Sequence, residues 1–506
     1  MNRRNFIAGA AGAVLGTEGR FQPAGPATAG RRPNLLLIMA DQFRPDCLGA
    51  DGNRMIRTPN LDRLAARGIR FRRAYSATPT CTPARAALLT GLSPWNHGML
   101  GYGKIAESYP IEMPRLLAKA GYYTAMIGKG HYSPQRSLHG FHFGLLDEAS
   151  RVESVDFRND YRCWFYSMAP NRDPEETGLG SNDYRAAPYA LPEQLHPTHW
   201  TGQTAAEFLK TYTRPEPFFL KVSFNRPHSP YDPPERWWKR YEDADLPQAQ
   251  VGAWAGRYAA CDPTDYNLWH GDLGERQVRK SRQGYYGSIS HVDEQIGRIL
   301  EALDHRGWTE QTLIVFTADH GDMTGDHHLW RKSYAYESSA RIPMLVAWPE
   351  SLVEAQRGQV SSRPVELRDV LPTLLDAAGA TSPLPMDGRS LLALARGREE
   401  GWREWIDLEH DICYSPENHW NALTDGTWKY IYHARDGVEQ LFHLDRDPWE
   451  KEDLAGSEAH SAPLRNWRER LIRHLAPRGE EFVAGGRLAL RPGSRLYSPH
   501  YPKKTV

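Results

Sequence analysis

The sequence predicts an α/β fold in which a mixed, mostly parallel sheet is flanked by helices, followed by a smaller C-terminal α+β subdomain. Two observations predict the larger part. Apolar segments of strand length alternate with helical segments, and polar side chains directly follow each apolar segment. The strand-like segments are residues 34–40, 122–127, 218–224 and 312–317. A third observation, two strand-like segments at residues 427–433 and 439–447, predicts antiparallel strands in a unit that begins near residue 401.

Helical segments lie between these strands and end at glycines. Residues 60–67 place leucines on one face before Gly68, and residues 114–120 end at Gly121. The longest helix is predicted over residues 284–306, which carry an apolar stripe. Residues 141–197 have little periodicity and exceed what a simple connection needs, so we expect this insertion to carry binding loops.

The composition restricts the class of partner. The 506 residues contain 62 Lys and Arg against 62 Asp and Glu, which gives a formal net charge of zero. No global field therefore draws the chain to nucleic acid, and recognition of an anion must be local. Five cysteines are few for this length, so disulfides do not build the fold, and the sequence leaves open whether any pair forms.

The N-terminus resembles an export signal over residues 1–29. Arg3 and Arg4 form a twin-arginine-like pair before a short apolar run, and Ala27-Thr28-Ala29 offers a small-residue cleavage site. The run is too short to span a membrane as a helix, so we expect no membrane insertion. This order of features predicts an exported protein, either in a bacterial periplasm or secreted.

The segment Cys81-Thr82-Pro83-Ala84-Arg85 indicates a nucleophile just ahead of a helix. Pro83 suits a first helical turn, and the unpaired amides there favour an anion. Arg85, one turn further on, can direct its guanidinium to the same place. A buried structural cysteine is the alternative for any single Cys. A redox role is disfavoured because no C-x-x-C motif accompanies Cys81.

Asp41 and Asp319 each follow a predicted strand, with Gln42 and His320 beside them. Carboxylate and amide oxygens favour Ca²⁺ or Mg²⁺, and an imidazole shifts the preference toward Mn²⁺. An aspartate at a strand end is also a common helix cap. The pattern nevertheless indicates one divalent metal site.

A further group of side chains suits binding an oxyanion and protonating a leaving oxygen. Its members are Arg85, Lys129, His131, His228 and Lys332. The neighbouring run Asp326-His327-His328 lacks further ligands at suitable spacing, so we expect these residues at the surface or outside the metal site.

Together these residues resemble the sulfatase family, the formylglycine-dependent type I sulfatases of the alkaline-phosphatase-like superfamily. Cys81, Pro83 and Arg85 meet the signature C-x-P-x-R, and the segments NLLLIMADQFRPDCLG, GKGHY, PHSPY and FTADHGDMTGDH stand in the family's order. The resemblance implies an alkaline-phosphatase-like fold. We therefore predict a catalytic domain over residues 33–385 and a C-terminal subdomain over residues 400–506.

The resemblance also implies the chemistry. A formylglycine-generating maturation enzyme would oxidise Cys81 to formylglycine, whose hydrated form attacks the sulfur of a sulfate monoester. The implied metal ligands are Asp41, Gln42, Cys81, Asp319 and His320. The implied catalytic side chains are Cys81, Arg85, Lys129, His131, His228 and Lys332. The substrate would be an aryl sulfate or a sulfated saccharide.

One departure from the family pattern concerns the metal. Many sulfatases carry two successive aspartates where this chain has Asp41-Gln42. A neutral amide makes the site less negative, so Mn²⁺ or Mg²⁺ stands as an alternative to the expected Ca²⁺. With a glutamine at this position, the segment also resembles the phosphonate monoester hydrolases of the same superfamily. The second hypothesis is therefore a phosphonate monoester or phosphodiester hydrolase. A non-catalytic binding protein of the same fold is disfavoured by the intact set of site residues.

Overall fold

The computed structural model describes residues 32–154, 156–416 and 418–502. The predicted export signal at residues 1–29 lies outside the described residues and stays a prediction. None of the helices in the described ranges has the length and apolar character needed to cross a membrane.

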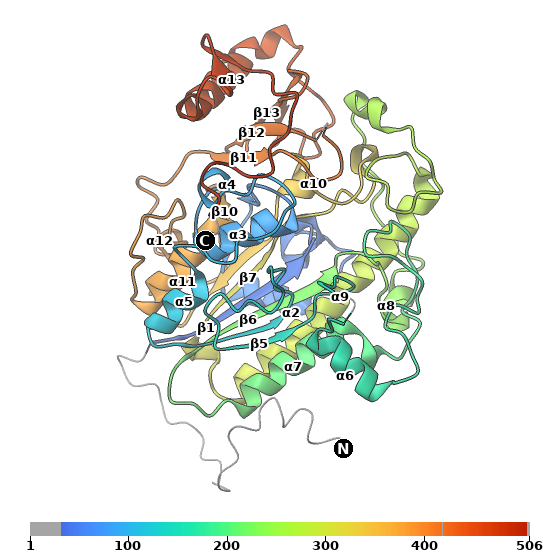
Figure 1. The fold of residues 1–506 in the computed structure, drawn as a ribbon, viewed down its shortest axis with the longest axis vertical. Helices are drawn as coiled ribbons and strands as arrows, with labels where there is room; N and C mark the ends of the chain where they lie inside the picture. Colours follow the sequence, from blue (N-terminus) through green and yellow to red (C-terminus); the bar gives the residue numbers. More distant parts are fainter. Residues whose placement is uncertain (1–31, 155, 417, 503–506) are drawn as a thin grey trace, which may run out of the picture.

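A central eight-stranded sheet with the order β5-β4-β6-β1-β7-β8-β2-β9 organises the chain (Figure 1). Its strands are β1 Asn34–Asp41, β2 Gly68–Phe71, β4 Tyr123–Gly128, β5 Phe143–Leu146, β6 Phe218–Pro227, β7 Thr312–Ala318, β8 Met344–Ala347 and β9 Gln359–Ser361. Strands β5, β4, β6, β1 and β7 run parallel, whereas β8 is antiparallel to both neighbours. The mixed, mostly parallel sheet predicted from the sequence is confirmed.

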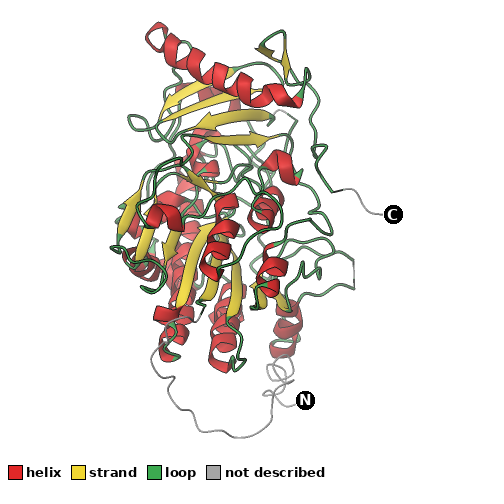
Figure 2. Cartoon of the chain, turned by 90° about the vertical axis from the view of Figure 1, so that its left-hand side faces the viewer, coloured by secondary structure: helices red, strands yellow, loops and turns green. Residues whose placement is uncertain are grey.

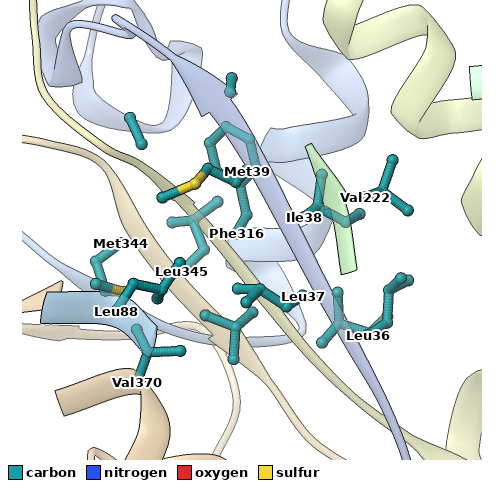
Figure 3. Close-up of a cluster of buried hydrophobic side chains, with 14 of the residues drawn as sticks. Leu36, Leu37, Ile38, Met39, Leu88, Val222, Phe316, Met344, Leu345 and Val370 are labelled. Carbon is teal, nitrogen blue, oxygen red and sulfur yellow. The ribbon is translucent and has the colours of Figure 1, made fainter. Parts of the chain in front are cut away.

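Strand β1 lies in the middle of the sheet and is buried on both faces. Its side chains alternate between the two faces: Ile38 is in register with Val222 of β6 and with Phe316 of β7, whereas the next residue, Met39, points to the opposite face (Figure 3). Side chains of a strand alternate between the two faces, so only a continuous apolar run suits a strand covered on both sides.

Helices cover both faces of the sheet. Helices α7 (Pro197–Thr211) and α9 (Gly274–His305) pack against each other and against β6 (Figure 1). On the other side, α3 (Cys81–Thr90) contacts α5 (Met113–Lys119) and α11 (Val370–Ala378). Helix α9 begins at Gly274, ten residues before its predicted start. The extra residues are mostly charged and polar, so the apolar stripe did not reveal them.

The C-terminal unit contains the antiparallel sheet β11-β12-β13-β14, which lies at the top of the molecule beneath α13 (Ser461–Leu475) (Figure 2). Its strands are β11 Ile406–His410, β12 Trp420–Thr424, β13 Trp428–His433 and β14 Glu439–His443. The predicted antiparallel pair is confirmed as β13 and β14. The domain boundaries at residues 385 and 400 stay a prediction.

Shorter elements connect these layers. They are α2 Pro59–Ala66, α4 Pro94–His97, α6 Asp160–Met168, α8 Glu235–Arg240, α10 Glu337–Ala340, α12 Leu392–Ala395, β3 Ala74–Tyr75, β10 Val365–Glu366, β15 Val483–Ala484 and β16 Arg487–Leu488. The five cysteines are free thiols in the structure.

Candidate active site

The carboxyl ends of the parallel strands place the predicted site residues close together. Asp41 is the last residue of β1, and Asp319 directly follows β7. Lys129 directly follows β4, and His228 directly follows β6. Parallel strands end at the same edge of the sheet, so residues far apart in the chain become neighbours there.

Cys81 is the first residue of α3 rather than the residue ahead of it, and only 1% of it is exposed. Its Sγ lies 3.0 Å from Lys332 Nζ, 3.2 Å from His320 Nε2 and 3.9 Å from Lys129 Nζ. Burial and the Asp41 carboxylate raise the pKa of the Cys81 thiol, but the neighbouring cations outweigh these two effects. The net result is a pKa of about 6, which is below the usual value of a thiol. The site therefore favours a negative charge at this position.

Arg85 lies one turn along α3 and is fully buried beneath the site. Its Nε donates to Asp319 Oδ2 at 3.0 Å, and Nη2 donates to Asp41 Oδ2 at 3.3 Å. Nη1 donates to the Lys129 carbonyl at 2.9 Å and to Ser223 Oγ at 3.1 Å. The guanidinium thus fixes both carboxylates and the start of the loop after β4.

Four buried side chains could hold a metal. Asp41, Cys81, Asp319 and His320 each offer a ligand atom, and these atoms all lie within 4.8 Å of one another. His320 Nδ1 donates to the Gly321 carbonyl at 2.9 Å, so a neutral ring leaves the Nε2 lone pair directed toward the other ligands. Burial raises the pKa of Asp41, but Lys129, His228 and Lys332 lower it well below its usual value. An ionised carboxylate and an oriented imidazole fit a divalent cation.

Gln42 is held by Asp322, an acid that was not among the site residues predicted from the sequence. Its Nε2 donates to Asp322 Oδ2 at 2.6 Å, and Tyr231 donates its hydroxyl to the same oxygen at 2.5 Å. The amide oxygen of Gln42 accepts from Lys332 Nζ at 3.2 Å. The amide is therefore oriented with its oxygen toward the reactive side chains and its nitrogen toward Asp322. The only sequence signal for Asp322 is its place three residues after Asp319.

Lys332 and His228 form a proton-carrying pair beside Cys81. His228 Nδ1 donates to the Ser229 carbonyl at 2.8 Å, so its Nε2 accepts from Lys332 Nζ at 2.8 Å. Burial and then the Lys332 charge lower the pKa of His228 well below its usual value. The pKa of Lys332 is raised, because the Cys81 and Asp41 charges outweigh the effect of burial. The proton of this pair therefore resides on Lys332.

The loop after β4 carries Lys129 and His131. Lys129 Nζ donates to Asp41 Oδ2. The backbone amides of Gly130 and His131 donate to Glu148 Oε1 at 2.7 and 2.8 Å, which fixes the turn of this loop. His131 Nε2 lies 3.3 Å from the Tyr102 hydroxyl, and Nδ1 has no hydrogen-bond partner among the described residues. His131 is thus placed at the rim with one nitrogen available.

Asp326-His327-His328 is expected either at the surface or outside the metal site, and the structure excludes a surface position for Asp326 and His327, which are buried. Asp326 accepts from Arg44 Nη1 at 2.8 Å through Oδ2 and from Arg282 Nη2 at 2.7 Å through Oδ1. Two buried guanidinium groups need a buried carboxylate, so this aspartate neutralises charge in the shell that supports the site.

A buried arginine, Arg331, directly precedes Lys332 in the chain. The side chain of Arg331 is 5% exposed, and its guanidinium stacks on the Tyr414 ring with 4.1 Å to the ring centroid. It donates to the Asn267 carbonyl, and no carboxylate in the described ranges forms an ion pair with it. Its Nε has no partner among those residues. Arg331 is therefore a cation that no acid in the described part of the chain neutralises.

Comparison with known proteins identifies relatives along most of the chain. Residues 33–380 match the family described as Sulfatase, and residues 325–476 match N-sulphoglucosamine sulphohydrolase, C-terminal. The chain is 38% identical over 470 residues to an arylsulfatase from Clostridium perfringens, which covers 90% of this chain and 97% of the relative.

Two further comparisons show how varied such relatives are. A choline-sulfatase from Rhizobium meliloti is 32% identical over 454 residues, covering 84% of this chain and 82% of the relative. The crystal structure of a phosphonate monoester hydrolase of Agrobacterium radiobacter has a TM-score of 0.76 and 26% identity, covering 90% of this chain and 97% of that one. Because the family match extends over most of the chain and includes the residues gathered around Cys81, this chain belongs to the sulfatase family.

Proposed function

We propose that this protein hydrolyses sulfate monoesters of phenols or saccharides, with Cys81 as the precursor of the nucleophile. The observation that carries the proposal is the position of Cys81 in its signature segment, where Sγ contacts Lys332 and His320 and faces two buried carboxylates. Membership of the sulfatase family and the similarity to an arylsulfatase support the same reaction.

We infer that a maturation enzyme oxidises Cys81 to formylglycine and that one divalent metal is held by Asp41, Gln42, Asp319, His320 and the modified residue. When present, the hydrated aldehyde supplies an oxygen nucleophile, and the metal supplies polarisation of sulfate oxygens. Ca²⁺ remains the first candidate, with Mn²⁺ or Mg²⁺ as alternatives because an amide and an imidazole replace hard anionic ligands.

The protein's own cations would hold the sulfate and the leaving oxygen. Lys332 Nζ lies 3.0 Å and Lys129 Nζ lies 3.9 Å from Cys81 Sγ, so both lysines are suited to binding sulfate oxygens. Lys332 carries the proton that it shares with His228, so it is the donor for the departing alcohol. Arg85 holds Asp41 and Asp319 in place, and His131, whose Nδ1 has no partner among the described residues, would help to activate the nucleophile.

The neighbourhood of Arg331 bears on the substrate. A buried guanidinium without an acid favours an anionic substituent on the leaving group, since that substituent would supply the missing counter-charge. The same charge disfavours a cationic alcohol such as choline. We therefore propose aryl or saccharide sulfates that carry a second anionic group. Export through residues 1–29 to the periplasm or beyond belongs to the same proposal.

A phosphonate monoester hydrolase is the second candidate, favoured by Gln42 and by the structural similarity to such an enzyme. The test compares kcat/KM for 4-nitrophenyl sulfate and for 4-nitrophenyl phenylphosphonate on metal-loaded protein. We expect the sulfate to be preferred and the Cys81→Ala variant to lose turnover while remaining folded. A higher kcat/KM for the phosphonate would reverse the assignment, and full activity of Cys81→Ala would remove it.

A further inference from the structure

We propose that Glu193, His199 and His291 form a second metal site, separate from the one around Cys81, that takes a borderline transition-metal cation such as Zn²⁺. Glu193 lies in the short 3-10 helix Glu193–Leu195 at the end of the insertion, His199 lies in the first turns of α7, and His291 lies in the middle of α9. Their potential ligand atoms all lie within 4.8 Å of one another.

The separation of the ligand atoms suits a small tetrahedral ion. Glu193 Oε1 lies 3.6 Å from His291 Nε2. Bonds of about 2.1 Å to a tetrahedral zinc would separate two ligand atoms by roughly 3.4 Å. Two imidazoles and one carboxylate with a fourth position for water are a ligand set that zinc accepts, whereas Ca²⁺ and Mg²⁺ prefer oxygen ligands alone.

His291 supplies an independent reason to expect a ligand. The residue is 0% exposed, yet neither of its ring nitrogens has a hydrogen-bond partner among the described residues. An unpaired buried polar group costs about 1–3 kcal/mol, so a group of this kind indicates an ion or a water that is not part of the chain.

The neighbouring His196 does not compete for the ion, because both of its nitrogens are engaged. Its Nδ1 accepts from the Thr198 amide at 3.1 Å, and Nε2 donates to the Asp232 carbonyl at 3.2 Å. Its ring packs edge-on against His291 with 4.9 Å between centroids. His196 therefore fixes the orientation of the His291 ring without binding the metal.

Two arginines lie against the proposed ligands and compete with a cation for them. Arg236 of α8 donates to Glu193 at 2.6 and 2.7 Å, and each carboxylate oxygen retains a lone pair for a metal. Arg298 Nη1 lies 3.3 and 3.4 Å from the two nitrogens of His199. Arg298 is half-buried and also pairs with Glu294 at 3.6 Å, so it has an alternative partner when a metal occupies His199.

A metal at this place would join the end of the insertion to the two long helices that cover β6. Helices α7 and α9 lie side by side in Figure 1 and contact each other. The site is therefore structural in character, and its occupancy is expected to affect the thermal stability of the protein more than sulfate-ester turnover.

The test measures zinc bound by the full-length protein. Chelator-treated protein is dialysed against Zn²⁺, and bound zinc is counted by mass spectrometry for the parent, His291→Gln, His199→Ala and the control His305→Ala, an exposed histidine at the end of α9. We expect both ligand variants to bind one equivalent less than the parent and the control. Equal zinc content in all four proteins would overturn the proposal.

A second variant separates metal binding from simple misfolding. Arg298→Gln removes the competing cation and keeps all three ligands, so it should tighten zinc binding at this site by roughly tenfold. Zinc should also raise the melting temperature of the parent and of Arg298→Gln by more than that of His199→Ala, which keeps only the metal site around Cys81. Unchanged or weaker zinc affinity in Arg298→Gln would contradict the site.

Discussion

Replacing Gln42 with glutamate is the perturbation whose magnitude follows most directly from the structure. The new carboxylate oxygen would stand where Gln42 Nε2 now donates to Asp322 Oδ2 at 2.6 Å. Two unit charges at that separation repel by about 6 kcal/mol at an effective dielectric constant of 20. Protonation of one of the two acids requires less free energy than this repulsion, because raising a glutamate pKa from about 4.3 to above 7 costs about 3.7 kcal/mol at pH 7.

The sign of the pH dependence follows from the same argument. The folded-state pKa of the new acid lies above its unfolded value, so the penalty is absent below about pH 4 and grows by about 1.4 kcal/mol per pH unit above it. The contact with Lys332 reduces the penalty, so we expect Gln42→Glu to lower the free energy of unfolding by about 2–4 kcal/mol at pH 7 and by less than 2 kcal/mol at pH 5.5.

Urea unfolding of chelator-treated protein at the two pH values measures this difference. The double variant Gln42→Glu/Asp322→Asn is the control, since the amide at position 322 can donate to the new carboxylate and should recover most of the stability. A Gln42→Glu penalty that is the same at both pH values, or that persists in the double variant, would refute the account of Gln42 as the partner of Asp322.

Three further predictions concern other parts of the site. Asp326→Asn should destabilise the fold by about 3–5 kcal/mol, because it leaves Arg282 without a carboxylate partner among the described residues and Arg44 with Asp46 alone. The pKa of Asp326 lies well below its usual value, so the stability that its carboxylate contributes is present above about pH 4 and is lost as pH falls. The difference in free energy of unfolding between parent and variant, measured in urea, should therefore narrow in acid, and a constant difference would contradict this. Lys332→Ala should lower kcat by roughly 10²–10⁴-fold for alkyl sulfates and much less for 4-nitrophenyl sulfate, whose good leaving group needs little protonation; equal losses would exclude Lys332 as the acid. Arg331→Gln should lower kcat/KM for 4-sulfooxybenzoate by roughly 10–100-fold and leave its methyl ester nearly unaffected, and an equal effect on both esters would remove Arg331 from substrate selection.

Most of the central sheet could be predicted because β1, β4, β6 and β7 are continuous apolar runs whose carboxyl ends carry polar residues. Strands β2, β8 and β9 have only three or four residues each, and no periodicity can be measured over so short a run. The antiparallel direction of β8 depends on tertiary packing that its own sequence does not encode.

The candidate site was predictable where residue type and strand end coincide, as for Asp41 and Asp319. The supporting residues were not predictable, because their role depends on partners distant in the chain. Asp322 acts through Gln42, which precedes it by 280 residues. Arg226 is likewise buried and donates to Asp232 at 2.7 and 3.0 Å. No local pattern distinguishes such a buried pair from two surface charges.

The chemical state of Cys81 tests the central claim most directly. Trypsin should release the peptide that extends from Ala74 to Arg85, and mass spectrometry of protein that is active on a sulfate ester measures its mass. We predict a peptide that carries an aldehyde in place of the thiol and that reacts with an alkoxyamine. An unmodified Cys81 thiol throughout a sample that hydrolyses sulfate esters would contradict the proposed nucleophile.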